Sequence, residues 1–241
     1  MLTNIVILLV AQGSHVAKDS GVYLSSWAVW STFLTFAIGV YLSFFVNQSE
    51  LKEQNKRSFC SAWKWWVYLY QQSLVWSILA TLAFWSLIWP AMLASKGKTG
   101  ERLKNDVYWK IEMILDHSTP LFCLLLDYSV NAIPMARRHV VPILATSTVY
   151  LLVNLIYVKA SGRWVYKFLS WESFLTVLIA LAIGLVMGLM HYCLFRINIY
   201  KLTKFAEKRD IDSEAVEILL CGRVQSEVEY GDGTDDYYHT P

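Results

Sequence analysis

Four long stretches of this 241-residue chain contain no lysine or arginine, and they constrain the fold more than any other feature. They cover residues 22–46, 66–94, 140–158 and 172–195. Each is mainly apolar and reaches the roughly 17–25 residues that a helix needs to cross a ~30 Å hydrocarbon layer. Because a backbone in lipid must satisfy its own hydrogen bonds, we expect each stretch to form a transmembrane helix.

The composition indicates the same class of protein. The chain is 56% apolar and 17% charged, whereas a soluble domain usually has about 45–50% apolar and about 25% charged residues. Its 11 Trp, 14 Tyr and 11 Phe suit two interfacial aromatic belts. The four cysteines are scattered singly, without zinc-type spacing, so we predict no metal site and no cofactor. The net charge of +2 gives no reason to expect a nucleic acid partner.

Two further segments complete the predicted topology. Residues 107–133 are long enough to span but contain Glu112, Asp116, His117 and Asp127, which we expect to face the bundle interior. The apolar run 2–11 is too short to span alone and lacks the basic start of a signal peptide, so segment 1–20 is a shortened or re-entrant candidate for a sixth helix. The predicted fold is an all-α, polytopic transmembrane bundle of five full spans within residues 21–196.

The last part of the chain, 197–241, differs in character. Residues 197–208 continue as a basic helix out of the membrane, and a weak excess of Lys and Arg on that side favours a cytoplasmic or matrix C-terminus. Residues 206–241 hold ten of the 19 acidic residues. An acidic tail without its own core becomes ordered mainly by docking, so we expect a protein partner for it.

The polar residues of 107–133 form a pattern of their own. Charged groups at membrane depth cost roughly 2.5–3.5 kcal/mol each, so a cluster of them is a functional hypothesis. On a helix, one face would hold Glu112, Asp116, Thr119, Cys123 and Asp127. This face is either a functional stripe or, alternatively, a seam where polar side chains bond neighbouring helices. Counting ~1.5 Å per residue from the predicted span starts places His117 near the bilayer centre, within one helical turn of Thr35.

A histidine beside a hydroxyl in the membrane suggests nucleophilic catalysis. A threonine hydroxyl needs a base within hydrogen-bond reach. Thr32, Thr35 and Thr81 are candidate hydroxyls at a depth similar to that of His117. Asp116 is the next residue to His117 and points ~100° away on a helix, so it would orient the ring poorly.

Several short strings resemble the androgen-induced-gene family of multipass membrane proteins. They are Trp30 with Phe33-Leu34-Thr35-Phe36, Phe84-Trp85, His117-Ser118-Thr119-Pro120, Arg138-His139, and Gly162-Arg-Trp-Val-Tyr166-Lys-Phe-Leu169. The last string, before the final span, is the most specific. The resemblance covers roughly residues 20–196.

This resemblance implies an activity. Members studied as enzymes are threonine hydrolases that cleave fatty acid esters of hydroxy fatty acids, which implies Thr35 as nucleophile and His117 as base, with Thr32 competing for the first role. It also implies membrane lipids as partners and an endomembrane or plasma membrane location. The chain departs from the family pattern in two places. Pro120 stands only three residues after His117, and the first transmembrane helix of the family is reduced here to about ten apolar residues.

Two other functions fit the sequence. One is a non-catalytic accessory subunit of a large membrane assembly, for example in the mitochondrial inner membrane, which the acidic tail and the tryptophan-rich second span favour. The other is transport. A proton or ion path could follow Glu112, Asp116 and Asp127, whereas haem would need two histidines at one depth, and His117 and His191 differ by about 13 Å.

Overall fold

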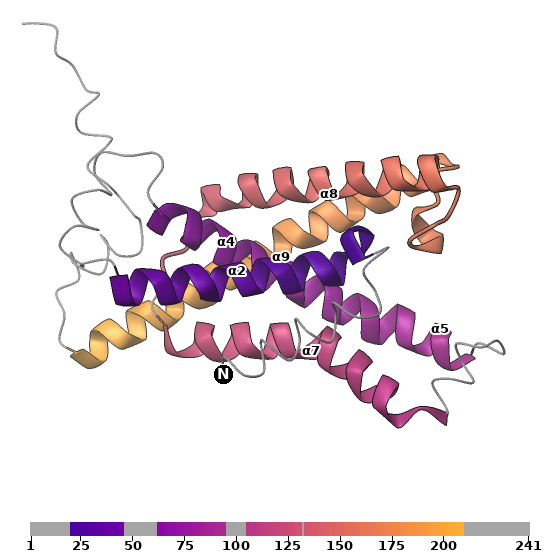
Figure 1. The fold of residues 1–241 in the computed structure, drawn as a ribbon. Coiled ribbons are helices and arrows are strands. Elements are labelled where there is room, and N and C mark those ends of the chain that lie inside the picture. The colour runs from indigo at the N-terminus through magenta and orange to yellow at the C-terminus, as the bar shows by residue number, and fades with distance from the viewer. Residues whose placement is uncertain (1–19, 46–61, 95–104, 132, 210–241) are drawn as a thin grey trace, which may run out of the picture.

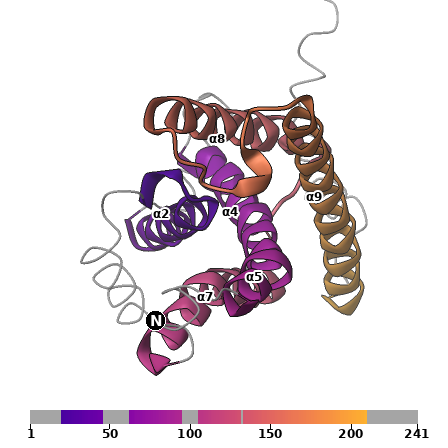
Figure 2. The same ribbon diagram turned by 90° about the vertical axis from the view of Figure 1, so that its right-hand side faces the viewer.

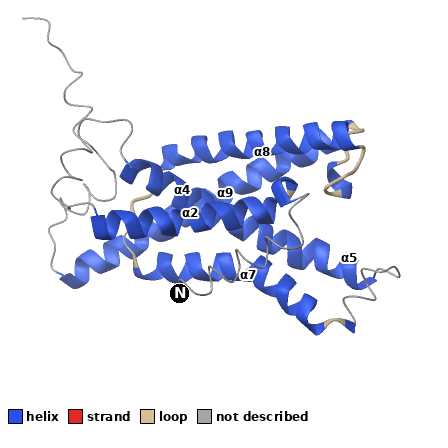
Figure 3. Ribbon diagram, in the orientation of Figure 1, coloured by secondary structure: helices blue, strands red, loops and turns tan. Residues whose placement is uncertain are grey.

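The computed structural model describes residues 20–45, 62–94, 105–131 and 133–209. Within these residues every regular element is a helix, which confirms the predicted all-α class (Figure 3). The apolar run 2–11 and the acidic tail beyond Arg209 lie outside the described residues. The predictions made for those two segments therefore stay predictions.

The long helices follow the predicted spans with small shifts of their ends. They are α2 (Leu24–Phe45), α4 (Ala62–Ala83), α7 (Val107–Val130), α8 (Val140–Ser161) and α9 (Phe174–Arg209). Short elements join or extend them: η1 (Ser20–Val22), the π-helical turn η2 (Phe84–Ile88), α5 (Trp89–Ala94), η3 (Arg137–His139) and η4 (Lys167–Leu169). As predicted, the last span continues without a break into a basic segment, forming one helix of 36 residues.

Successive long helices run in opposite directions (Figure 1). Helix α2 packs against α4, α4 against α7, and α8 against α9, whereas α7 and α8 lie on opposite sides of α4 (Figure 2). One end of the bundle holds the α7–α8 connection and the end of α9, and we call it the C-terminal end. The other end holds residues 162–173, which connect α8 to α9; we call this segment the strap and its side of the molecule the strap end. Within the described residues four helices are long and apolar enough to cross a membrane: Leu24–Phe44, Trp63–Ala94, Arg137–Ser161 and Phe174–Phe205.

The fifth full span is not confirmed, because α7 is long enough but too polar to count with the other four. Its buried residues are Pro120, Leu124 and Tyr128, which share one face at i, i+4 and i+8. The polar stripe that we expected to face the interior is only half-buried at all five positions. The apolar stripe of α7 therefore packs inward, and the acidic residues lie beside it.

Helix α4 is the centre of the bundle. It packs against α2, α7, α8 and α9, and Figure 2 shows these helices around it. Tyr70, Leu74, Val75 and Trp76 are at most 2% exposed. The Tyr70 hydroxyl donates to the carbonyl oxygen of Leu124 on α7 at 3.1 Å. The middle of α4, residues 73–77, is thus buried on every side, whereas Trp65 and Leu82 nearer its ends are exposed.

Helices α2 and α4 approach closely because small residues face each other. Ala28, Thr32, Thr35 and Gly39 follow one another at spacings of four, three and four residues on the α2 face that meets α4. At Gly39 an added Cβ would lie 3.0 Å from Nε1 of Trp66, and that indole donates to the Thr35 carbonyl oxygen at 2.9 Å. Such small residues allow the backbones of membrane helices to pack tightly.

Two prolines shape the strap half of the bundle. Pro90 has no N–H that could bond the Ser86 carbonyl oxygen. Just before Pro90 the helix widens into the π-turn, in which the Trp89 N–H bonds the Phe84 carbonyl oxygen. Pro120 lies inside α7, which changes direction near its middle in Figure 1. The first halves of α7 and α5 consequently diverge from α8.

Candidate functional site: a lipid-facing cavity with a buried histidine

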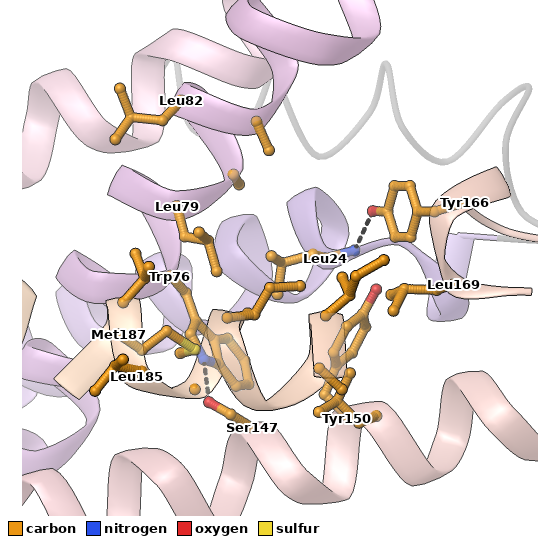
Figure 4. A pocket seen from close by; sticks show the side chains of 18 of the residues that line it. Leu24, Trp76, Leu79, Leu82, Ser147, Tyr150, Tyr166, Leu169, Leu185 and Met187 are labelled. Atoms are coloured by element: carbon orange, nitrogen blue, oxygen red, sulfur yellow. Dashed lines mark hydrogen bonds between the residues drawn. The ribbon is translucent and has the colours of Figure 1, made fainter. Parts of the chain in front are cut away.

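A cavity of about 1120 Å³ lies in the strap half, between α4, α8 and α9 (Figure 4). This volume is slightly above the roughly 300–1,000 Å³ typical of ligand sites. Its wall is mainly apolar and includes Trp76, Leu79, Leu144, Leu151, Ile183 and Met187. Leu87, Leu181 and Leu185 also line it and are more than half exposed, so the cavity opens toward the surface that faces lipid in a membrane.

Polar groups mark the two ends of this cavity. At the deep end the Trp76 indole donates to Ser147 Oγ at 3.0 Å, which ties α4 to α8. At the strap end Tyr166 accepts a hydrogen bond from the Leu24 backbone N–H at 3.1 Å. Both bonds are visible in Figure 4. Burial raises the pKa of the Tyr166 hydroxyl, so this group stays neutral.

His117 also lines the cavity. Its ring stacks on Phe84 with centroids 3.7 Å apart and planes 13° from parallel. Its Nδ1 atom is buried without a hydrogen-bond partner. Because most buried polar atoms are paired, an unpaired ring nitrogen on a cavity wall is a candidate contact for a ligand.

The local sequence explains how His117 is held. Pro120 lacks the N–H that would bond the Asp116 carbonyl and disturbs this turn of α7. Thr81 on α4 donates its hydroxyl to the His117 carbonyl oxygen at 2.6 Å. The π-turn begins at Phe84, the residue on which the ring stacks. Irregular turns on both helices therefore meet at this histidine, as is frequent at functional sites.

Thr35, the predicted nucleophile, lies elsewhere. It is 1% exposed between α2 and α4 and does not line the cavity. Its hydroxyl donates to the Ser31 carbonyl oxygen at 2.8 Å and lies 3.0 Å from Ser73 Oγ. Thr32 is similar, with a 2.7 Å bond to the Ala28 carbonyl oxygen and Ser77 Oγ at 3.5 Å.

The structure does not bring Thr35 and His117 together. The α4 partner of Thr35 is Ser73 and that of His117 is Thr81, eight residues further, or about 12 Å along the helix axis. The depth count from the sequence treated the spans as straight and parallel, whereas α7 bends at Pro120. The catalytic roles of the two residues stay predictions.

A second polar cluster lies in the C-terminal half, and sequence analysis missed it. Gln71, fully buried on α4, donates from Nε2 to the Pro134 carbonyl oxygen at 3.0 Å and lies 2.8 Å from His139 Nδ1. Its Oε1 is 3.1 Å from Nε2 of His191 on α9. The Ala136 N–H also donates to His139 Nδ1 at 3.4 Å.

His139 Nδ1 also lies 3.1 Å from Gln71 Oε1, so both atoms of the amide contact this ring. The Ala136 N–H, a fixed donor, favours the tautomer in which His139 Nδ1 accepts and Nε2 carries the proton. Gln71 thus joins α4, η3 and α9 through side-chain hydrogen bonds. The sequence signal was a glutamine within an apolar span, since such residues form bonds between membrane helices.

The lining residues restrict the chemistry at the cavity. None of the described lining residues is Lys, Arg, Asp or Glu. Among the described residues there is also no group of three His, Cys, Asp or Glu side chains that could hold a metal ion. The arrangement suits an apolar ligand with few oxygen atoms, such as the acyl chain of a lipid.

Comparison with known proteins gives no relative: no family model, no curated protein and no solved structure matches the chain.

Proposed function

We propose that this integral membrane protein takes the acyl chain of a lipid from the bilayer into the cavity and acts on an ester bond beside His117. The observation that carries the proposal is the unpaired, buried Nδ1 of His117 on the wall of an apolar, laterally open cavity. An acyl ester is itself a membrane lipid, so it can enter from the side. Hydrolysis of carboxylic esters is also the activity that the family resemblance implies.

The reaction requires a base, and His117 fits that role. In the proposed step a hydroxyl oxygen attacks the ester carbonyl carbon while His117 takes its proton. The histidine then returns the proton to the leaving alcohol as the carbon–oxygen bond breaks, and water releases the acyl group in a second, similar step. Thr35 as nucleophile would have to cross the ~12 Å that separates Ser73 from Thr81 along α4.

The direct test is labelling of the detergent-solubilised protein with a fluorophosphonate. We expect labelling of the wild type and none of His117→Ala, because the hydroxyl loses its base. Loss of labelling in Thr35→Ala, but not in Thr32→Ala, would identify the nucleophile. Unchanged labelling and ester hydrolysis by folded His117→Ala would exclude the hydrolase proposal.

A second candidate function is that of a non-catalytic accessory subunit that binds lipid in the same cavity. The observation that favours it is the position of Thr35, whose hydroxyl is engaged between α2 and α4. Purification of the native protein tests this candidate. A stable complex that dissociates when residues 210–241 are deleted, together with no fluorophosphonate labelling, would support it.

A further inference from the structure

Four serine and threonine side chains among the described residues line the cavity: Ser25, Ser86, Ser147 and Thr148. The hydroxyls of Ser86, Ser147 and Thr148 each donate to a carbonyl oxygen of their own helix, at 2.6, 2.7 and 2.9 Å. The Ser25 hydroxyl differs, because no hydrogen bond joins it to another described residue. Of these four hydroxyls, the one on Ser25 can therefore transfer its proton without first breaking a bond to the backbone.

The position of Ser25 in α2 explains why its hydroxyl is unpaired. Further along this helix Thr32 and Thr35 donate to the carbonyl oxygen four residues earlier. Ser25 is the second residue of α2, and the carbonyl oxygen four residues before it belongs to Gly21, which already accepts the Trp27 indole N–H at 2.7 Å. The Ser25 side chain is half-buried, so its hydroxyl lies on the cavity wall without a partner from its own helix.

Ser25 and His117 lie at the same level along α4. The Thr32 hydroxyl is 3.5 Å from Ser77 Oγ on α4. Ser25 is two turns before Thr32 on the same face of α2, and Phe84 is two turns after Ser77 on the same face of α4. Because the two helices are antiparallel, both steps run ~10 Å in the same direction, and they end at one level. The ring of His117 stacks on Phe84, so it lies at this level too.

The side of α2 that carries Ser25 is turned away from α8. Trp27, two residues later and thus about 160° around the helix axis, contacts the ring of Tyr150 on α8 with centroids 5.5 Å apart. Helix α7 lies across α4 from α8 and packs against both α2 and α4 (Figure 2). His117 is the one described residue of α7 that lines the cavity. The Ser25 hydroxyl and the His117 imidazole therefore border one cavity from neighbouring helices.

We propose that Ser25, and not Thr35, is the nucleophile of the hydrolase site, with His117 as its base. This inference rests on the proposed function and names the hydroxyl that acts there. Ser25 Oγ forms a bond to the ester carbonyl carbon while His117 takes the hydroxyl proton. The bond between that carbon and the alcohol oxygen then breaks as His117 gives the proton to the alcohol, which leaves the acyl group on Ser25. Water attacks this acyl-enzyme, its proton passes through His117 to Ser25 Oγ, and the carboxylic acid departs.

The first test locates the reacting atom in the full-length, detergent-solubilised wild type. A long-chain fluorophosphonate bonds an activated hydroxyl oxygen to its phosphorus atom with loss of fluoride, and mass spectrometry of the peptides then identifies the modified residue. We expect the adduct on Ser25, a result that does not depend on the folding of any variant. An adduct on Thr35 or on another residue overturns this inference and leaves the proposed function standing. No adduct together with no hydrolysis of a long-chain ester overturns the proposed function as well.

The second test compares the rates of ester hydrolysis of three variants. Ser25→Ala should lower the rate by at least about 100-fold, because it removes the attacking oxygen. Thr35→Ala should keep most of the wild-type rate, since that hydroxyl is bonded between α2 and α4. Ser26→Ala is the matched control: Ser26 is the next residue of the same turn, is 6% exposed and does not line the cavity. An unchanged rate in folded Ser25→Ala, or an equal loss in Ser26→Ala, would overturn the assignment.

Discussion

The C-terminal half and the strap half of this bundle use the same five helices and pack them differently. In the C-terminal half, Gln71 joins two histidines and a backbone carbonyl, and Trp66 fits against Gly39. In the strap half the helices diverge around a cavity, and the ring of His117 has an unpaired nitrogen. One half is closely packed and joined by hydrogen bonds, and the other contains the cavity and the unpaired nitrogen atom on which the proposed function rests.

The largest effect that this comparison predicts is on stability, from Gln71→Leu. The substitution leaves His139, His191 and the Pro134 carbonyl without their shared partner in a buried site. We expect a loss of about 3–5 kcal/mol in the free energy of unfolding, because each unpaired buried group costs about 1–3 kcal/mol. Thermal unfolding in detergent, followed by circular dichroism, measures it. The control is Gln72→Leu, since Gln72 is only half-buried; equal losses in the two variants would contradict the role of the network.

The second prediction compares two glycines, one in each half. Gly39→Leu should destabilise the protein by about 2 kcal/mol, because a Cβ added at this position would lie 3.0 Å from the Trp66 indole nitrogen. Gly184→Leu should change the stability little, because a Cβ there meets nothing within 4 Å. Melting temperatures of the two variants, measured side by side, check the contrast. If Gly184→Leu is the more damaging change, the strap half is not the open half.

The third prediction is that Gly184→Phe lowers lipid binding more than stability. Gly184 lines the cavity, so a phenyl ring there occupies volume that the acyl chain needs. We expect about a tenfold weaker photolabelling by a diazirine lipid, equivalent to about 1.4 kcal/mol. Ile156→Phe is the control, since Ile156 is exposed on α8 and does not line the cavity. Unaltered labelling of folded Gly184→Phe would show that the lipid binds elsewhere.

The smallest expected effect comes from Ser118→Ala. Ser118 accepts a hydrogen bond from the Trp85 indole at 3.2 Å, and this contact is solvent-exposed in the isolated chain. Its loss should cost about 0.5 kcal/mol, at the lower limit for one hydrogen bond. Unfolding measurements should thus place this variant within a degree or two of the wild type. A shift as large as that of Gly39→Leu would reveal that α7 and the π-turn depend on this contact.

The fold was largely predictable because the physics of lipid leaves few choices. An apolar stretch without Lys or Arg has to be helical in a bilayer. Helices α2, α8 and α9 begin and end within a few residues of the stretches that predicted them, apart from the basic extension of α9, and α4, η2 and α5 together cover the predicted stretch 66–94. The status of α7 was harder to predict. Its polar stripe predicts an inner face at Glu112, Asp116 and Asp127, whereas Pro120, Leu124 and Tyr128 pack inward.

The candidate site was predictable only in part. His117 stood out as a histidine at membrane depth, and it does line the cavity. The separation of His117 from Thr35 depends on the bend at Pro120 and on the packing of Thr35 against Ser73, neither of which a count of residues per span contains. Gln71 was missed because a single amide in an apolar span gives no motif, and only the neighbours that the fold provides distinguish it.

The π-turn at Phe84–Ile88 has a consequence for the direction of everything beyond it. A π-turn holds one residue more than the α-helical path would, so the residues after it are offset by about 100° around the axis. Deleting one residue from this turn would rotate Leu93 and its neighbours to another side of the helix while α4 keeps its core contacts. A single-residue deletion in this turn would therefore redirect the outer surface of α5 and, because Leu87 and Ile88 line the cavity, change the cavity wall as well.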